Sequence, residues 1–262
     1  MNDFKLKISF ISLIAFIFLN KLYPQNSQNK SGFGIEVPKE GELIFDGTEK
    51  MLHDKWTYWE GPRLSAKLPI KWKIEQDPLG KEKVLNAFDL NAKNGKYGAA
   101  DIVTKKKYND FRLHIEFFIK NKDGNSGVYL QNRYEIQIKD GDSTKHGIGA
   151  IINEKESPYS LYNGLGKWNS YDIKFRAARF KNDKIIEQPI VSIYFNGKMI
   201  HDNVKIKKVW GGPFSGLDGG NNNGYGITPS PGGIKLQSEG HEVLYRNIWI
   251  EELELENNDT SF

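Results

Sequence analysis

Residues 125–140 (NSGVYLQNRYEIQIKD) alternate apolar and polar side chains with a period of two. The apolar parity carries Val128, Leu130, Tyr134, Ile136 and Ile138. The other parity carries Tyr129, Gln131, Arg133, Glu135, Gln137 and Lys139. Successive side chains of a strand point to opposite faces, so the pattern predicts strand with one face in a core. The polar face, with its aromatic surface and mixed charge, is the leading candidate for a ligand-facing surface.

The same parity constrains the path of the chain within this segment. A two-residue turn at Asn132 and Arg133 would set Leu130 directly opposite Glu135 and mix the two faces. Either a three-residue turn centred on Asn132 or one long bent strand keeps the faces separate. In the first case Tyr129 and Glu135 become cross-strand neighbours, with an aromatic ring beside a carboxylate.

Most of the remaining chain has the same two-residue period. The segments that read as strands are residues 41–47, 72–76, 82–88, 110–120, 170–180, 189–203 and 232–253. Asn196-Gly197, flanked by apolar alternation, is a strong hairpin signal, and Glu239-Gly240 is a weaker one. No segment has a convincing helical period over eleven residues or more. The sequence therefore predicts an all-β, antiparallel sandwich or barrel, and a sandwich that bears a polar cleft fits best.

The first 25 residues resemble a secretory signal peptide. Lys5 and Lys7 precede the uncharged run ISFISLIAFIFL, whose twelve residues are short for a membrane span, although an uncleaved anchor is the alternative. We expect a linker or extended arm at residues 26–40, one domain at residues 41–253 and a frayed tail at residues 254–262. The expected location is periplasmic or secreted.

Composition excludes several classes of protein. The chain has no cysteine, so a lipid-anchored lipoprotein and a disulfide framework are both excluded. Removal of residues 1–25 takes away three lysines and one aspartate, which leaves 34 basic against 32 acidic side chains. A nucleic-acid binder usually has a concentrated basic excess, so no nucleic-acid partner is expected. After cleavage of the signal peptide, no stable membrane insertion is expected either.

Several familiar catalytic motifs are absent from the sequence. It has no G-x-S-x-G elbow, no phosphate loop and no H-E-x-x-H zinc pair, and its five histidines have no close ligand spacing. No cofactor is expected. The Asp218–Asn223 loop could supply oxygen ligands to Ca²⁺, but an Asn/Gly-rich loop is more often a simple turn.

The central strand invites comparison with sandwich-fold laminarinases and lichenases. Their catalytic strand carries acids at i, i+2 and i+4, where this chain has Glu135, Gln137 and Lys139. A retaining glycosidase needs two carboxylates about 5 Å apart, and the second one is missing from its place. Glu116, on the polar parity of its own predicted strand, could supply it from a neighbouring strand.

A more specific resemblance emerges from the order of short motifs. They are FDG at 45–47, DFRLHIEF at 110–117, GNSGVYLQNRYEIQIKD at 124–140, KHGIGAI at 145–151, KWNSYDI at 167–173, FNG at 195–197 and GGIKLQSEGHEVLYRNIWI at 232–250. This succession resembles the 3-keto-disaccharide hydrolase domain family over nearly all of the chain after residue 40. The resemblance implies a concanavalin A-like sandwich and cleavage of glycosides whose sugar is oxidised at C3.

The implied chemistry accounts for the missing carboxylate. A ketone at C3 acidifies the hydrogen on C2, so one base can start elimination of the anomeric substituent, and water can then add back. Glu135 is the candidate base, although a glutamate paired with Arg133 or Lys139 on a wet face is an equal alternative. His146, Lys235 and Arg133 are candidate proton donors or oxyanion stabilisers, and each could instead be an ordinary surface residue.

Further side chains are candidates for binding the sugar. The amides of Gln137 and Gln237 suit paired hydroxyls, and Tyr129 and Trp168 could stack on a pyranose face, although a core position is common for such a tryptophan. Asp140 is either a turn residue or a second acid. Two other functions stay open: a non-catalytic, lectin-like carbohydrate-binding module, and a retaining β-glucanase that uses Glu116 and Glu135.

Overall fold

The computed structural model describes residues 32–59, 69–89, 100–158, 160–209, 226–256 and 259–260. The expected signal peptide and the Asp218–Asn223 loop lie outside the described residues. Among the helices that are described, none has the length and apolarity needed to cross a membrane. The described strands run from Gly41 to Leu253.

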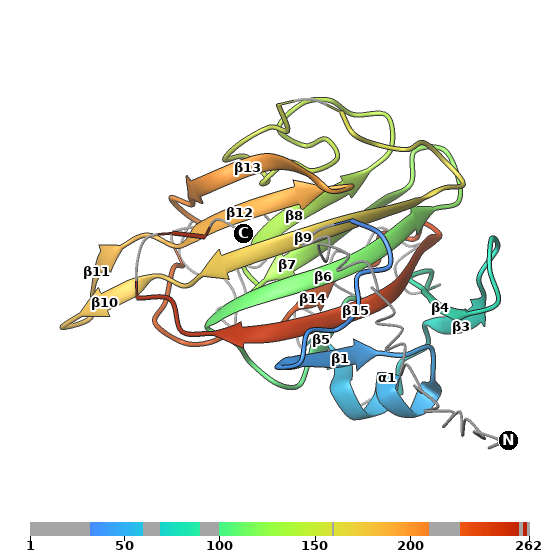
Figure 1. Ribbon diagram of the computed structural model, residues 1–262, viewed down its shortest axis with the longest axis horizontal. Coiled ribbons are helices and arrows are strands. Elements are labelled where there is room, and N and C mark those ends of the chain that lie inside the picture. The colour runs from blue at the N-terminus through green and yellow to red at the C-terminus, as the bar shows by residue number, and fades with distance from the viewer. Residues whose placement is uncertain are drawn as a thin grey trace, which may run out of the picture.

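Two antiparallel sheets form the two layers seen in Figure 1. The larger has eight strands in the order β13-β12-β9-β6-β15-β4-β3, with β1 paired to β15. Their bounds are β1 Gly41–Phe45, β3 Lys73–Gln76, β4 Lys83–Asn86, β6 Asp110–Ile119, β9 Trp168–Arg176, β12 Ile190–Phe195, β13 Lys198–Lys205 and β15 Val243–Leu253. This sheet contains strands from every segment expected to be a strand except residues 125–140, although the end of 170–180 and the start of 232–253 lie outside it.

The smaller sheet has five strands in the order β2-β5-β14-β7-β8. Their bounds are β2 Trp56–Tyr58, β5 Ile102–Thr104, β7 Asn125–Leu130, β8 Tyr134–Lys139 and β14 Lys235–Leu236. A ribbon of β10 Arg179–Lys181 and β11 Lys184–Glu187 projects from the sandwich, and the short helix α1 Glu49–Lys55 precedes β2. The helix spans seven residues, too few for a periodic signal to identify it from the sequence.

One hydrophobic core lies between the two sheets. Leu113, Ile115 and Phe117 of β6 belong to it, and so do Ile136 and Ile138 of β8. The layers also meet through the tilted rings of Tyr134 and Phe175, and the Tyr171 hydroxyl donates to the Gln137 carbonyl at 2.7 Å. The fold is therefore the antiparallel β-sandwich that the sequence predicts.

The central hairpin takes the first of its two expected paths. A three-residue turn, 131–133, joins β7 to β8, and Gln131 and Asn132 adopt positive φ angles of 49° and 55°. Tyr129 consequently lies directly opposite Glu135. The hairpin predicted at Asn196-Gly197 is also confirmed, with β12 paired to β13.

The hairpin predicted at Glu239-Gly240 is wrong. β14 pairs with β5 and β7 in the small sheet, whereas β15 pairs with β6 and β4 in the large one. The turn therefore carries the chain from one layer to the other. The apolar alternation on each side of Gly240 reports burial, which is the same for a hairpin and for a crossing between layers.

The described part of the N-terminal arm packs on the outer face of the large sheet (Figure 1). The Gly32 amide donates to Asp172 and the Gly34 amide to Glu116, each at 2.7 Å. The Ile35 carbonyl accepts hydrogen bonds from Asn247 and Trp249, both at 3.2 Å. From residue 32 on, the segment expected to be a linker is therefore held by side chains of the sheet.

Candidate functional site

A row of three polar side chains crosses the outer face of the small sheet. Lys235 of β14 pairs with Tyr129 of β7, and Tyr129 pairs with Glu135 of β8. All three have the parity opposite to the core residues of their strands, as Ile136 and Leu236 illustrate for β8 and β14. The polar face proposed from the sequence is therefore continuous across three strands.

The next row is formed by Gln137, Gly127 and Gln237. Gln137 lies opposite Gly127, and the Gln237 amide nitrogen donates to the Gly127 carbonyl at 3.0 Å. Both glutamines are buried, with exposed fractions of 7% and 4%. The side-chain amide of Gln237 donates to the Tyr129 hydroxyl at 3.1 Å, whereas the Gln137 side-chain oxygen accepts from the Ile138 amide. Glu135, Gln137 and Gln237 thus share one face of the small sheet.

Glu135 is half-buried, and burial raises the pKa of its carboxyl group to about 7. A hydrogen bond from Tyr129 and the charge of Lys235 oppose that rise in pKa, while the negative charges of Glu239 and Asp101 add to it. Within the described residues Glu135 has no ion pair closer than 4 Å. Its carboxylate is therefore a base whose pKa lies near neutral pH, the range in which general bases work efficiently.

Lys235 is a fully buried cation beside this base. Its ammonium group donates to Asp101 at 3.1 Å, and both side chains are inaccessible to solvent. The same nitrogen lies 4.1 Å from the centre of the Trp59 ring and 3.7 Å from that of Tyr129. Two aromatic faces and one carboxylate therefore stabilise the charge. Lys235 can influence Glu135 through the electrostatic effect of its positive charge and through its contact with the Tyr129 ring.

Sequence reasoning missed three members of this cluster, namely Trp59, Asp101 and Glu239. Asp101 is buried and also accepts from the Ser238 amide at 2.9 Å. Glu239 is half-buried; burial raises the pKa of its carboxyl group, the charge of Asp101 raises it further, and that of Lys235 opposes the rise. The parity of residues 235, 237 and 239 could have indicated Glu239, but its place in a turn signal concealed it.

Tyr129 and Arg133 contribute differently from what was expected. The Tyr129 ring is 1% exposed and one of its faces is covered by Lys235, so the hydroxyl is the part that reaches Glu135. Arg133 is 1% exposed within the turn, where its guanidinium donates to Gln131 at 2.9 Å. Stacking on a sugar by Tyr129 is thus not supported by its position.

Asp140 and His146 lie beyond the end of β8. Asp140 is half-buried and accepts from the Asp123 amide at 3.1 Å, which is the turn role considered for it. His146 is exposed in the segment between β8 and β9, and its backbone amide donates to the Thr144 hydroxyl at 3.2 Å. No described contact joins His146 to Glu135, so its catalytic role stays a prediction.

Glu116 and Trp168 do not belong to this face, which corrects two predictions. Both lie on the outer face of the large sheet, on the far side of the core from Glu135. Glu116 accepts from Arg246 at 2.7 Å, and Trp168 packs against Phe118 beneath the Arg246 guanidinium. Parity showed that each side chain points away from the core, but it does not show to which sheet a strand belongs.

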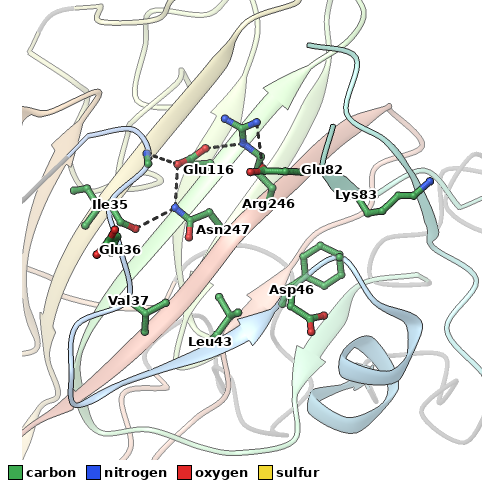
Figure 2. Close-up of a pocket in the computed structure, with 13 residues that line it drawn as sticks. Ile35, Glu36, Val37, Leu43, Asp46, Glu82, Lys83, Glu116, Arg246 and Asn247 are labelled. Carbon is green, nitrogen blue, oxygen red and sulfur yellow. Dashed lines mark hydrogen bonds and ion pairs between the residues drawn. The ribbon is translucent and has the colours of Figure 1, made fainter. Parts of the chain in front are cut away.

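Figure 2 shows the surroundings of Glu116, which lines a hollow of about 550 Å³. Its carboxylate lies between the backbone of the N-terminal arm and the Arg246 guanidinium. Burial by itself would raise the pKa of Glu116, but hydrogen bonds from His114, Gly34, Asn247 and Arg246 lower it to about 2. These contacts give Arg246 and Asn247 a structural role, because they hold β15 to Glu116 and to the N-terminal arm.

Among the residues that the structure describes, no three His, Asp or Glu side chains are grouped so that they could hold a metal ion. The proposed Ca²⁺ loop at Asp218–Asn223 is not among those residues.

Three crystal structures from Parabacteroides distasonis share this fold, and each is of a candidate glycosyl hydrolase. The first is 26% identical over 82% of this chain and 84% of its own, with a TM-score of 0.62. The others are 18% and 19% identical, over 82% and 81% of this chain and 94% and 99% of theirs, with TM-scores of 0.56 and 0.51. No curated protein is significantly similar to this chain.

The model of the 3-keto-α-glucoside-1,2-lyase-like domain matches residues 40–251, which is most of the 262-residue chain. The chain belongs to this family. The match includes both sheets, so the polar row of Lys235, Tyr129 and Glu135 lies within the 3-keto-α-glucoside-1,2-lyase-like domain. The family resemblance noted in the sequence is thereby confirmed.

Proposed function

We propose that this protein cleaves 3-keto-glycosides, with Glu135 as the base that removes the proton from C2 of the oxidised sugar. Membership of the family and the shared fold support a carbohydrate-active function. The observation that carries the finer proposal is the Glu135 carboxylate, half-buried on a polar sheet face and hydrogen-bonded to Tyr129, with a pKa of about 7.

The reaction runs as an elimination followed by a hydration. Glu135 takes the proton from C2, the electrons of the C2–H bond form a C1–C2 double bond, and the bond from C1 to the glycosidic oxygen breaks. That oxygen takes a proton and leaves as the alcohol. Water then adds its hydroxyl group to C1 and a proton to C2, so the net reaction is hydrolysis. The C3 ketone makes the first step feasible because it stabilises the developing negative charge.

Neighbouring residues support this role of Glu135. Tyr129 donates a hydrogen bond to the carboxylate, and the buried charge of Lys235 favours anionic species on this face. Glu239, whose pKa is raised by burial, is the candidate donor of the proton to the leaving oxygen. Gln137 and Gln237 are the candidates for binding sugar hydroxyls.

The contacts of Glu116 argue against the retaining glucanase. That mechanism pairs Glu116 with Glu135 at about 5 Å, but the two carboxylates project from opposite outer faces of the sandwich. A lectin-like module would be favoured if both glutamates were locked in ion pairs. Glu116 meets that condition through Arg246, whereas Glu135 has no such partner in the described part of the chain.

The decisive assay compares a 3-keto-disaccharide with its unoxidised parent. We expect release of reducing sugar from the oxidised substrate and none from the parent. Release from the parent at a similar rate would indicate an ordinary glycosidase. Binding of either sugar by calorimetry without turnover would indicate the lectin-like alternative, and Glu135→Gln retaining full activity would refute the assignment of the base.

The amino-terminal pattern also leads us to propose a periplasmic or secreted location. Fractionation of cells that express the full chain tests this, and recovery of the protein in the cytoplasm alone would contradict it.

A further inference from the structure

We propose that Gly127 is a positioning residue for the base. Because residue 127 has no side chain, the Glu135 carboxylate can pack directly on the backbone of β7 at this position. The inference rests on the proposed function of Glu135 for its catalytic meaning, but the geometry it describes can be tested without any substrate. Gly127 lies opposite Gln137 in the hairpin, two residue pairs away from the Tyr129–Glu135 pair and on the same face of the sheet.

The Glu135 side chain lies where a side chain of residue 127 would begin. A Cβ atom built on Gly127 would lie 2.4 Å from Oε1 of Glu135 and 3.1 Å from both Cδ and Cγ, and these are its three nearest atoms. Real Cβ atoms do not approach other atoms within 3.0 Å. The Glu135 side chain therefore folds diagonally from β8 across β7, over the position where any other residue would carry its side chain.

Backbone conformation does not explain this glycine. Nine described glycines have positive φ angles, and Gly127 is not one of them, so an alanine could adopt its backbone without strain. Glycine in the interior of a strand is also unfavourable in itself, because it is flexible and buries no side chain. The contact with Glu135 is the feature that distinguishes this position.

Packing on Gly127 places the Glu135 carboxylate beside its hydrogen-bond donor, Tyr129. Tyr129, two residues along the same strand, donates to Glu135 and accepts from the Gln237 side chain at 3.1 Å. The Gly127 carbonyl accepts from the Gln237 backbone at 3.0 Å, which fixes β14 against β7 at this level. A side chain at residue 127 would turn the carboxylate away from Tyr129 and toward solvent.

A double-mutant cycle with Gly127→Ala and Glu135→Ala tests the steric relation through thermal unfolding. We expect Gly127→Ala to change the Tm less favourably in the parent protein than in the Glu135→Ala protein, where no carboxylate occupies the position of the added methyl group. Gly124→Ala is the matched control, because its Cβ would lie 2.3 Å from Ile119, so it should lower the Tm equally in both backgrounds. The same change in Tm for Gly127→Ala in both backgrounds would overturn the proposal.

Titration of the Glu135 carboxyl carbon by NMR in the Gly127→Ala protein supplies the second readout. We expect its pKa to fall toward the ordinary range because the displaced carboxylate is better solvated, and an unchanged pKa would contradict the displacement. Where the 3-keto-disaccharide is a substrate, kcat should fall about 10²-fold with little change in KM. If the Tm cycle and the NMR titration show that Glu135 packs on Gly127, this inference holds even when no 3-keto-glycoside is cleaved. Its failure and the failure of the proposed function can therefore be told apart.

Discussion

Glu116 and Glu135 occupy comparable positions on opposite faces of the sandwich, yet their carboxyl groups are shifted in opposite directions. Burial acts to raise the pKa of both. Around Glu116, the His114 side chain, the Gly34 amide, Asn247 and Arg246 outweigh burial and bring the pKa to about 2. Around Glu135, Tyr129 and the charge of Lys235 do not outweigh it, and the pKa is about 7.

The difference lies in what each carboxylate can still do. Glu116 is surrounded by donors and a guanidinium, so its charge is committed to holding the N-terminal arm and β15 in place. Glu135 keeps a proton affinity suited to neutral pH, and the negative charges of Glu239 and Asp101 maintain it. Burial therefore indicates a functional carboxyl group only when nearby hydrogen-bond donors and positive charges do not cancel its effect on the pKa.

Replacing the base should produce the largest effect of any single substitution. Glu135→Gln keeps the size of the side chain but cannot accept the C2 proton, so kcat should fall about 10²- to 10⁴-fold on a 3-keto-disaccharide. The folded protein should stay as stable as the parent or become more stable, since a buried carboxyl group is removed. Initial rates and urea unfolding check both expectations, and a large loss of stability would give Glu135 the structural role assigned to Glu116.

The equivalent substitution on the large sheet, Glu116→Gln, should reduce stability and leave catalysis unchanged. Glu116→Gln removes one of the carboxylates that Arg246 and His114 each contact, while Asp77 stays with Arg246 and Asp172 with His114, so it should cost about 1–3 kcal/mol of unfolding free energy. Urea unfolding measures that cost, and kcat per folded molecule should be unchanged. A substantial fall in kcat of folded Glu116→Gln protein would show that the two faces are not functionally separate.

The pH dependence of stability should separate the two glutamates. Relative to the ordinary value of 4.5, the raised pKa of Glu135 means that the folded state holds this proton more tightly, so its contribution to stability falls as pH rises from about 4.5 to about 7. The lowered pKa of Glu116 gives stability that is present above about 4.5 and is lost as pH falls toward about 2.

Unfolding of the two Gln variants across this pH range checks the assignment. Glu135→Gln should reduce the pH dependence of stability in the upper interval and leave the lower one unchanged, whereas Glu116→Gln should reduce it in the lower interval. The same change in both variants would mean that neither residue is responsible.

A smaller effect on activity is expected when Tyr129, the hydrogen-bond donor to Glu135, is replaced. Tyr129→Phe removes the hydrogen bond that opposes burial, so the pKa of Glu135 should rise further and the acidic limb of the kcat/KM profile should move to higher pH. At neutral pH we expect a loss of about tenfold, since roughly one charge-assisted hydrogen bond is removed. A uniform loss of activity at every pH would instead indicate that Tyr129 acts on the substrate.

The alternation of residues 125–140 was sufficient to predict the core face and to exclude a two-residue turn at Asn132 and Arg133. It left a three-residue turn and one long bent strand open, and the Tyr129–Glu135 pair followed only for the turn that the structure has. The same alternation could not place Glu116 or Trp168, since which strands share a sheet depends on contacts between distant segments. The Glu239-Gly240 error has the same origin. Lys235 and Asp101 illustrate a further limit, because a buried ion pair between residues 134 positions apart has no local signature.

The central claim is that Glu135 removes the proton from C2 of an oxidised sugar. The most direct measurement uses a 3-keto-disaccharide that carries deuterium at C2, with mass analysis of the released keto-sugar. If the claim is right, cleavage is slower than for the undeuterated substrate, the product loses its deuterium to solvent, and Glu135→Gln abolishes both cleavage and loss of label. Cleavage at an unchanged rate with the deuterium retained at C2 would show that the C2–H bond is never broken.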